Sequence, residues 1–374
     1  MDNGTSCPKR LLWVNGGLMN RGGIESFMMN YYRHFDRSQI QIDFIVHQAY
    51  GFGYYDEEIR SLGGRIYVLP QKSKHPISYT MKLKKILRSG NYKIIHTHMD
   101  AMGAWVLKVA KGCGIPVRIA HSHNTQHLTS NPIKLYFLEK ARKNIVKYAT
   151  HRMACGEDAG RWLFGNEQFD IIHNAIETQK FAFSQHNRET ARKTIGVSDS
   201  DFVIGHVGRF DTQKNHPFLI ELFDKVVRNH PQAKLILIGE GPNMEAIRKD
   251  VSMRNLNDKV IFTGVRDDVH LLYNAFDLFV LPSLFEGLVI VGVEAQINGC
   301  PCVFSNKVPA EVKLSDNVTF MELDIDAWKK EIGKAIQNRD KRRKAGFDIS
   351  DTGYDIEKES VKLQNKYLDL WIHA

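Results

Sequence analysis

Near the N-terminus the chain reads Leu11-Leu12-Trp13-Val14-Asn15-Gly16-Gly17-Leu18-Met19-Asn20-Arg21-Gly22-Gly23-Ile24-Glu25. An apolar run of strand length leads through four glycines into a helical pattern, which is typical of a strand, loop and helix unit. Bare glycine backbone lets amide groups approach a phosphate, and the helix N-terminus favours negative charge. Gly16, Gly17, Gly22 and Gly23 are therefore candidate phosphate-binding residues. A merely tight strand-to-helix turn would use the same glycines.

Similar apolar runs recur along the chain, with helical patterns between them. This alternation predicts βα units and parallel sheets, whose strands are buried on both faces and so appear as continuous apolar runs. The first set comprises Leu11–Val14, Ile42–Val46, Arg65–Leu69, Ile94–His96 and Val117–His121, and the second comprises Phe202–Val207, Lys234–Ile238, Val260–Thr263, Leu278–Leu281 and Pro301–Phe304. We therefore predict an α/β fold with two Rossmann-like halves.

The two sets of runs are separated by a polar stretch around Ile171–Phe183. A chain of 374 residues has room for two domains. We predict a first domain over residues 1–178 and a second over residues 179–354. The imperfect amphipathic pattern that follows predicts a C-terminal helix over residues 355–374.

The composition excludes several classes of protein. The 51 lysines and arginines exceed the 42 aspartates and glutamates, which gives a net charge of +9 and favours acidic partners without choosing among them. Only this charge would support nucleic-acid binding, so we do not expect nucleic acid as a partner.

Five scattered cysteines without a C-x-x-C pair indicate a reducing compartment. The most apolar stretch, Leu271–Ala295, is too interrupted for a membrane span, so we expect a cytoplasmic protein that is soluble or peripheral on the inner face of the cell membrane.

A positively charged loop follows the first strand of the second half. The strand Phe202–Val207 leads into Gly208, Arg209 and, five residues later, Lys214. Arginine offers a planar fork of donors and lysine a point charge, a pairing that suits the two phosphates of a diphosphate. Two solvated surface charges are the plainer alternative.

Two carboxylates stand eight positions apart in an otherwise apolar stretch. Glu286 precedes a helix that we expect to start near Leu288, and Glu294 lies within that helix. Carboxylates are seldom buried without partners, and ribose or sugar hydroxyls are suitable donors to them. Structural carboxylates that cap backbone amides remain the alternative.

These motifs carry a resemblance to a known family. The loop Gly208–Lys214 followed by Glu286 and Glu294 resembles the retaining GT-B glycosyltransferases of the family 4 type. The segments Val117–Asn124 and Ala154–Gly165 are similar to the branch that builds capsular and extracellular polysaccharide. The resemblance implies two Rossmann-like domains that face a central cleft, the first binding the acceptor and the second binding the nucleotide-sugar donor. It also implies that the C-terminal helix crosses back and packs on the first domain.

The resemblance also implies roles for individual residues. Arg209 and Lys214 would bind the donor diphosphate and stabilise the leaving group. Glu286 would bind hydroxyls of the transferred sugar, and Glu294 would bind the ribose hydroxyls. We therefore expect Arg209, Lys214 and Glu286 to be catalytic residues.

Backbone contacts to the donor are implied as well. Gly208 and the run Gly287, Leu288 and Val289 would touch the sugar and the phosphates, as would the four N-terminal glycines. The family usually has proline where this chain has Val289, which leaves the identity of the sugar open.

Histidines follow two strands of the first half. The family's cleft histidine, which hydrogen-bonds the donor sugar, falls on His121 or His123; we favour His121 as catalytic and expect His123 to help bind the donor. His96 and His98 repeat the pattern one strand earlier. Strand alternation puts His121 and His123 on the same side. A structural role stays open, and so does a metal site, although no further ligand cluster is evident in the sequence.

The segment Pro132–Arg152 predicts a basic helix. Lys140, Lys143 and Lys147 share one side of it, and the aromatic pair Tyr136–Phe137 could reach an interface. Such a helix can lie on an anionic membrane, while a solvated face on a core-packing helix explains the same pattern equally well.

We therefore expect a retaining glycosyltransferase, a hexosyl- or N-acetylhexosaminyltransferase that takes a sugar from a nucleotide-diphosphate donor, expected to be UDP-linked. Its acceptor would be a saccharide linked to a lipid such as polyprenyl diphosphate. We expect no cofactor, since the nucleotide-sugar is a substrate. We also expect no metal, because Asp199–Asp201 precedes a strand, Asp324–Asp326 stands in a polar stretch, and Arg209, Lys214 and a helix N-terminus would supply the positive charge instead. A catalytically silent GT-B partner subunit, or a dinucleotide-dependent oxidoreductase, is the alternative; the second lacks a regular glycine fingerprint.

Overall fold

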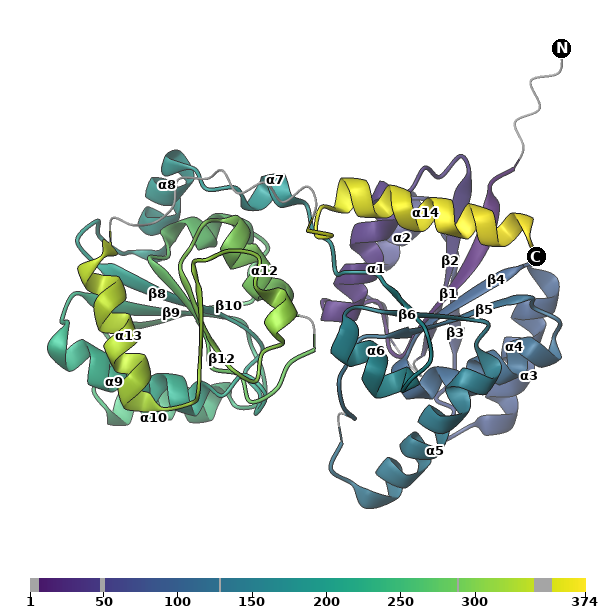
Figure 1. The fold of residues 1–374 in the computed structure, drawn as a ribbon, viewed down its shortest axis with the longest axis horizontal. Coiled ribbons are helices and arrows are strands. Elements are labelled where there is room, and N and C mark those ends of the chain that lie inside the picture. Colours follow the sequence, from purple (N-terminus) through teal and green to yellow (C-terminus); the bar gives the residue numbers. More distant parts are fainter. Residues whose placement is uncertain (1–6, 48–50, 128, 288, 340–351) are drawn as a thin grey trace, which may run out of the picture. The chain divides into compact units, whose positions relative to one another are not determined.

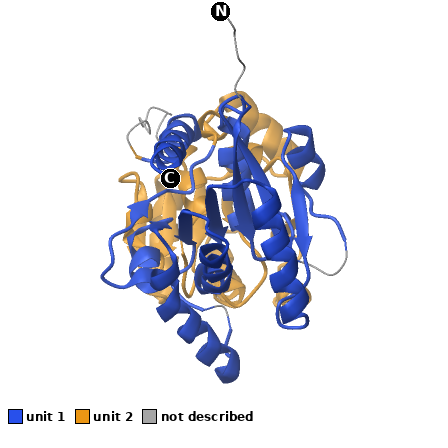
Figure 2. Cartoon of the chain, turned by 90° about the vertical axis from the view of Figure 1, so that its right-hand side faces the viewer, with its two compact units in different colours: residues 1–176, 353–374 blue, residues 177–352 orange. Residues whose placement is uncertain are grey.

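The computed structural model describes residues 7–47, 51–127, 129–287, 289–339 and 352–374. The chain divides into two compact units, which are coloured separately in Figure 2. Unit 1 comprises residues 1–176 and 353–374, and unit 2 comprises residues 177–352. Each unit is built around its own parallel sheet, so the prediction of an α/β fold with two parallel-sheet halves is confirmed.

Unit 1 holds a seven-stranded sheet in the order β3-β2-β1-β4-β5-β6-β7, in which all pairs are parallel (Figure 1). Its strands are β1 (Lys9–Asn15), β2 (Ile40–His47), β3 (Ile66–Leu69), β4 (Ile94–His98), β5 (Val117–Ser122), β6 (His151–Ala154) and β7 (Asp170–Ile171). The chain starts in the middle of the sheet and moves first to one edge, then to the other. Loops that follow β1 and β4 therefore lie next to each other.

Helices cover both faces of this sheet. They are α1 (Gly23–His34), α2 (Asp56–Ser61), α3 (Pro76–Ser89), α4 (Gly103–Gly112), α5 (Pro132–Tyr148), α6 (Glu157–Phe164) and α14 (Ile356–Ile372). Successive residues of β1 point to opposite faces, so Leu11 and Trp13 pack with α1 and α14, whereas Leu12 and Val14 pack with α3 and α4. The central strand is thus buried on both sides, as its continuous apolar run predicts.

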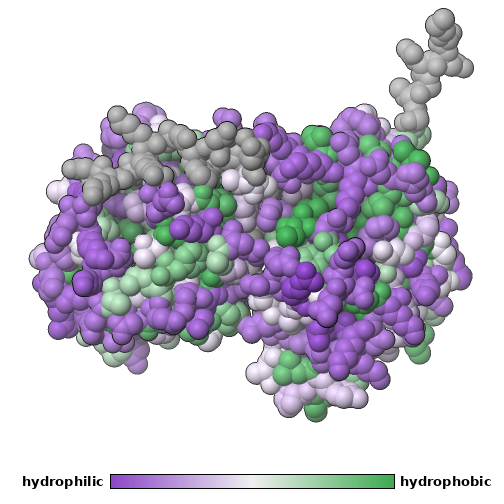
Figure 3. Space-filling model, viewed as in Figure 1, coloured by the Kyte–Doolittle hydropathy of each residue, from purple (hydrophilic) through white to green (hydrophobic). Residues whose placement is uncertain are grey.

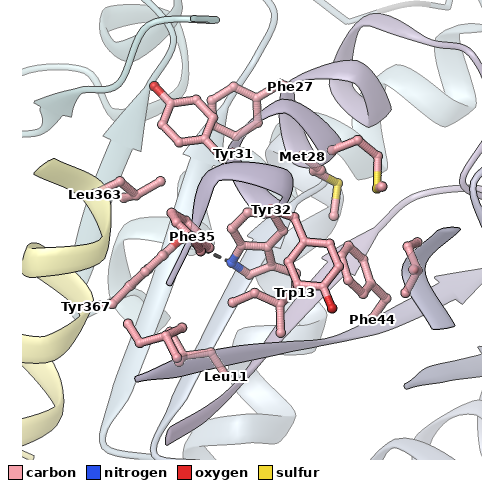
Figure 4. Packing of buried hydrophobic residues seen from close by; sticks show 14 of the residues in the cluster. Leu11, Trp13, Phe27, Met28, Tyr31, Tyr32, Phe35, Phe44, Leu363 and Tyr367 are labelled. Carbon is pink, nitrogen blue, oxygen red and sulfur yellow. Dashed lines mark hydrogen bonds between the residues drawn. The ribbon is translucent and has the colours of Figure 1, made fainter. Parts of the chain in front are cut away.

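The last helix belongs to unit 1. The backbone of Ile176 and Asp355 forms a parallel bridge, and from there α14 packs beside α1 and β4. Figure 4 shows Tyr367 of α14 among the aromatic side chains of the core, where Trp13 Nε1 donates a hydrogen bond to its hydroxyl at 3.1 Å. This confirms the predicted return of the C-terminal helix to the first domain.

Unit 2 holds a six-stranded parallel sheet in the order β10-β9-β8-β11-β12-β13. Its strands are β8 (Phe202–Val207), β9 (Ala233–Ile238), β10 (Val260–Gly264), β11 (Leu278–Leu281), β12 (Cys302–Ser305) and β13 (Val318–Met321). Its helices are α7 (Thr178–Phe181), α8 (Gln185–Ile195), α9 (His216–Asn229), α10 (Met244–Met253), α11 (Val269–Leu272), α12 (Ile290–Ile297) and α13 (Ile325–Gln337). One face of the sheet packs on α9, α10 and α13.

Replacing Tyr367 by phenylalanine should destabilise unit 1. The hydroxyl accepts from Trp13 Nε1 and lies 2.6 Å from His96 Nδ1, and all three side chains are fully buried. Its removal leaves two buried polar atoms without a partner, which costs about 1–3 kcal/mol of unfolding free energy. Chemical denaturation measures the loss. The exposed Val361 of the same helix provides the control, since Val361→Ala should change the unfolding free energy little; equal losses in the two variants would contradict this account.

Candidate functional site

Two loops of unit 2 that carry predicted site residues lie side by side. They follow β8 and β11, which are hydrogen-bonded neighbours in the sheet. Because the strands are parallel, both loops leave at the same edge. The amide of Leu284 donates to the carbonyl oxygen of Gln213 at 2.8 Å and joins the two loops.

Glu286 is the centre of this arrangement. It is 6% exposed, and Lys214 Nζ lies 2.7 Å from its Oε1. Gln213 donates to Oε2 at 2.8 Å, and the hydroxyl of Ser283 donates to Oε1 at 2.6 Å. The structure therefore brings the predicted residues Lys214 and Glu286 into a buried, hydrogen-bonded ion pair. Gln213 and Ser283, which the sequence analysis missed, stand one and three residues from them.

Gly208 makes room for this lysine. A Cβ atom at position 208 would lie 3.0 Å from Lys214 Cγ and 3.1 Å from His206 Nε2, closer than such contacts normally come. Gly239, at the end of β9, has φ +132° and passes directly against the carbonyl group of Gly208. This close approach of two backbone segments and the positive φ require glycine at position 239, whereas at position 208 a side chain would force Lys214 or His206 to shift.

Two buried histidines flank Lys214 and were not predicted. His206 Nδ1 lies 2.9 Å from the carbonyl oxygen of Val280, while His206 Nε2 and both ring nitrogens of His216 have no partner among the described residues. Burial, together with the nearby Lys214, lowers the pKa of His216 to about 4. Burial also lowers the pKa of His206 far below its usual value. Both rings are therefore neutral near pH 7 and offer polar atoms beside the ion pair.

Arg209 contrasts with Lys214. Its side chain is exposed, and it makes no hydrogen bond or ion pair with any other residue that the structure describes. Arg209 stands in the same loop after β8 as Lys214, and a guanidinium group without a carboxylate of its own is able to accept an anion.

Glu294 lies further along the same segment. Helix α12 begins at Ile290, two residues later than expected, so Glu294 is little more than one turn into the helix. The hydroxyl of Tyr273 donates to its Oε2 at 2.7 Å, and burial raises the pKa of Glu294 to about 7. Val289, at the N-cap of α12, is buried, and Gly287 precedes it. Leu288 lies outside the described residues.

The glycine loop of unit 1 joins β1 to α1. None of its four glycines has a positive φ. A Cβ atom at Gly17 or Gly23 would meet nothing within 4 Å, and at Gly16 only two methionine side chains at 3.9 Å, whereas at Gly22 it would overlap the carboxylate of Glu25. Neither conformation nor packing among the described residues thus requires glycine at 17 and 23. This open backbone is what a bound phosphate would need.

Four histidines, three in β4 and β5 and His123 directly after β5, form one cluster. His96 Nε2 lies 3.1 Å from His121 Nδ1, and His98 Nδ1 lies 3.0 Å from His123 Nε2. The rings of His121 and His123 are 4.1 Å apart and 18° from parallel, so both do point to the same side. Burial lowers the pKa of all four, that of His123 to about 3.

This cluster changes one expectation. Ligand atoms of His96, His98 and His121 lie within 4.8 Å of one another, so a further group of metal-ligating side chains does exist beside His121. Both nitrogens of His96 have hydrogen-bond partners, which fits a set of neutral, mutually bonded rings. His121 is fully buried, with Phe27 of α1 against its ring, and His123 is 7% exposed. Their contacts to a donor sugar stay predictions.

Helix α5 exposes apolar side chains at its N-terminal end. Ile133, Tyr136 and Phe137 are 70%, 66% and 62% exposed, and the i, i+3, i+4 spacing puts them on one face. Figure 3 shows hydrophobic residues among polar ones at this end of the helix, which is lowest in the view. Among the described residues, no helix has the length and apolar character to cross a membrane.

Two family models match the chain. Residues 21–180 match Glycosyltransferase Family 4, and residues 187–347 match Glycosyl transferases group 1. Together the two models account for both units of the structure.

Two relatives match most of the chain. A Bacillus subtilis (strain 168) protein assigned as glycosyltransferase EpsF is 36% identical over 97% of this chain and 97% of its own length. The Escherichia coli UDP-Gal:alpha-D-GlcNAc-diphosphoundecaprenol alpha-1,3-galactosyltransferase is 26% identical over 78% of this chain and 79% of its own.

Solved structures share the fold. Anabaena HepE in complex with UDP-glucose superimposes with a TM-score of 0.79 at 17% identity, covering 96% of this chain and 99% of that one. Sucrose-phosphate synthase from Thermosynechococcus elongatus superimposes with a TM-score of 0.78 at 16% identity, covering 98% of this chain and 100% of that one. The chain belongs to the GT-B glycosyltransferases of the group 1 and family 4 type.

Proposed function

We propose that this glycosyltransferase moves a sugar from a UDP-linked donor to a lipid-linked saccharide, with retention at the anomeric carbon, in the synthesis of surface polysaccharide. The observation that carries the proposal is the ion pair of Lys214 with the buried Glu286, together with the exposed Arg209 in the same loop as Lys214. Two relatives support it: EpsF, and the Escherichia coli galactosyltransferase whose acceptor is alpha-D-GlcNAc-diphosphoundecaprenol. HepE, whose fold is the same, binds UDP-glucose.

The proposed reaction needs no protein nucleophile. An acceptor hydroxyl oxygen attacks the anomeric carbon on the face that the diphosphate leaves. The bond between that carbon and the β-phosphate oxygen breaks, its electron pair stays on the phosphate oxygen, and this oxygen takes the hydroxyl proton. Arg209 and Lys214 stabilise the negative charge that develops on the diphosphate. Glu286 orients Lys214 and accepts hydrogen bonds from hydroxyl groups of the sugar. The two cations supply the positive charge, so we propose a metal-independent enzyme without a cofactor.

The acceptor side of the proposal rests on α5. Its exposed Ile133, Tyr136 and Phe137, together with Lys140, Lys143 and Lys147, give one helix an apolar end and a basic side. Such a helix binds anionic lipid surfaces through both features. We therefore propose a cytoplasmic enzyme that works at the inner face of the cell membrane, where a polyprenyl-diphosphate-linked acceptor would be found.

Nucleotide binding tests the donor assignment. In calorimetric titrations with UDP, GDP, ADP, CMP and NAD in the presence of a chelator, UDP should bind most tightly. Arg209→Ala should weaken UDP binding at least tenfold, because a charge-assisted contact to the diphosphate is lost. Arg228→Ala is the matched control, since Arg228 is exposed and paired with Asp224 on α9. Binding of NAD alone would favour the oxidoreductase, and no nucleotide binding would favour a silent subunit.

The pKa of Glu294 predicts a pH dependence of UDP binding. Ribose hydroxyls donate to the ionised carboxylate, so binding favours the deprotonated form. With a pKa of about 7 in the free protein, lowering the pH from 8 to 6 should weaken UDP binding about 10-fold. Glu294→Gln keeps an acceptor oxygen and should remove most of this dependence. An unchanged pH profile in the variant would contradict the ribose role.

Vesicle binding tests the membrane proposal. Replacing Lys140, Lys143 and Lys147 by alanine should weaken sedimentation with anionic vesicles, since each basic residue near such a surface contributes about 1 kcal/mol. Vesicles of neutral lipid serve as the control. If the triple variant and the unaltered protein bind anionic vesicles equally well, α5 is not part of a membrane-binding surface.

A further inference from the structure

A cavity of about 910 Å³ lies wholly within unit 1. It is lined by Gly16 after β1, His47 at the end of β2, Lys72 after β3 and Met99 after β4, so it opens at the carboxyl edge of the sheet. Ligands of open α/β sheets bind at this edge, and the volume falls within the range of about 300–1,000 Å³ of small-molecule sites. Gly16 places one wall of the cavity on the glycine loop.

The walls of the cavity are largely apolar. Met102 contributes from the position just before α4 and Trp105 contributes from α4 itself. Phe137, Leu138 and Tyr148 contribute from α5, which packs against α4. A surface of this kind suits hydrocarbon rather than a fully polar ligand.

Lysines are gathered at the same cavity. Lys72 Nζ and Lys108 Nζ lie 4.4 Å and 5.3 Å from the centre of the Trp105 ring, and Lys134 and Lys140 also line the cavity. No aspartate or glutamate lines it, and none of the four lysines forms an ion pair with a carboxylate in the described parts of the chain.

Both ammonium groups lie near the same indole ring, and no aspartate or glutamate lines the cavity to balance them. Partial burial lowers the pKa of Lys72, as expected for an ammonium group that is partly shielded from water. Phosphate groups are suitable partners for such lysines. The apolar walls beside these lysines therefore favour an amphiphilic phosphate ester over a soluble anion.

The apolar wall continues onto the exposed face of α5. Phe137 lines the cavity and is 62% exposed, and Ile133 and Tyr136 extend the same face. A hydrocarbon chain that leaves the cavity beside Phe137 can therefore continue along this apolar face of α5.

We propose that this cavity binds the diphosphate and the adjoining hydrocarbon of the lipid-linked acceptor, with Lys72 and Lys108 on the phosphates and Phe137 on the hydrocarbon. The assignment rests on the proposed function, which supplies a lipid-linked acceptor. Because Gly16 belongs to both the cavity and the glycine loop, a saccharide attached to that diphosphate would begin next to the proposed donor-binding backbone.

Calorimetric titration of the whole chain with farnesyl diphosphate tests this site. UDP is kept saturating, so that the proposed donor pocket is closed to the probe. Farnesyl diphosphate should bind at least tenfold more tightly than inorganic diphosphate and than farnesol, because the site recognises both parts of the molecule.

Matched variants locate the binding. Lys72→Ala with Lys108→Ala should weaken farnesyl diphosphate at least tenfold. Phe137→Ser should weaken farnesyl diphosphate while leaving inorganic diphosphate unchanged. Lys82→Ala with Lys111→Ala removes the same two charges from exposed positions on α3 and α4 that do not line the cavity, and should bind like the unaltered protein.

Three results would overturn the assignment: no binding of farnesyl diphosphate, equal affinity for inorganic diphosphate, or equal losses in the two double-lysine variants. The UDP titration distinguishes a failure of the cavity assignment from a failure of the proposed function. If UDP binds and farnesyl diphosphate does not, the cavity assignment is wrong and the donor assignment stands; if neither binds, the proposed function fails as well.

Discussion

The parallel direction of every strand is the constraint on which the rest of this structure depends. In each unit it brings all the loops that follow strands to one edge of one sheet, however far apart they stand in the sequence. Lys214 and Glu286 are 72 residues apart and meet because β8 and β11 are neighbours. The same rule gathers the glycine loop, the histidines and the walls of the cavity at the carboxyl edge of the sheet in unit 1.

The ion pair of Lys214 and Glu286 shows how such an edge can hold buried charge. Taking two charged groups out of water is costly, and the attraction between them offsets the cost only when further hydrogen bonds satisfy the carboxylate. Gln213 and Ser283 supply those bonds. The unpartnered nitrogens of His206 and His216 beside the pair have no such compensation from the described residues. Unsatisfied polar atoms grouped around a compensated pair are typical of a site that is completed by a ligand.

The sequence alone predicts the strands that are buried on both faces, because those residues form continuous apolar runs. It misses β6 and β13, which are only partly buried and carry mixed residues. It predicts that Lys214 and Glu286 share a site only through the family resemblance, since strand order cannot be read from spacing. The pairing of His96 with His121 depends on the register of β4 and β5, and the cavity depends on how α5 packs on α4; neither leaves a local pattern in the sequence.

The contact between the last helix and the core also determines the chemistry of a distant imidazole. An indole N–H can only donate, so the Tyr367 oxygen accepts from Trp13 and its own hydrogen is directed to His96 Nδ1. The neutral ring of His96 then carries its hydrogen on Nε2 and donates it to His121 Nδ1. His121 in turn carries its hydrogen on Nε2. The tautomer of a histidine on β5 is thus set, through the ring of His96, by a tyrosine of the last helix.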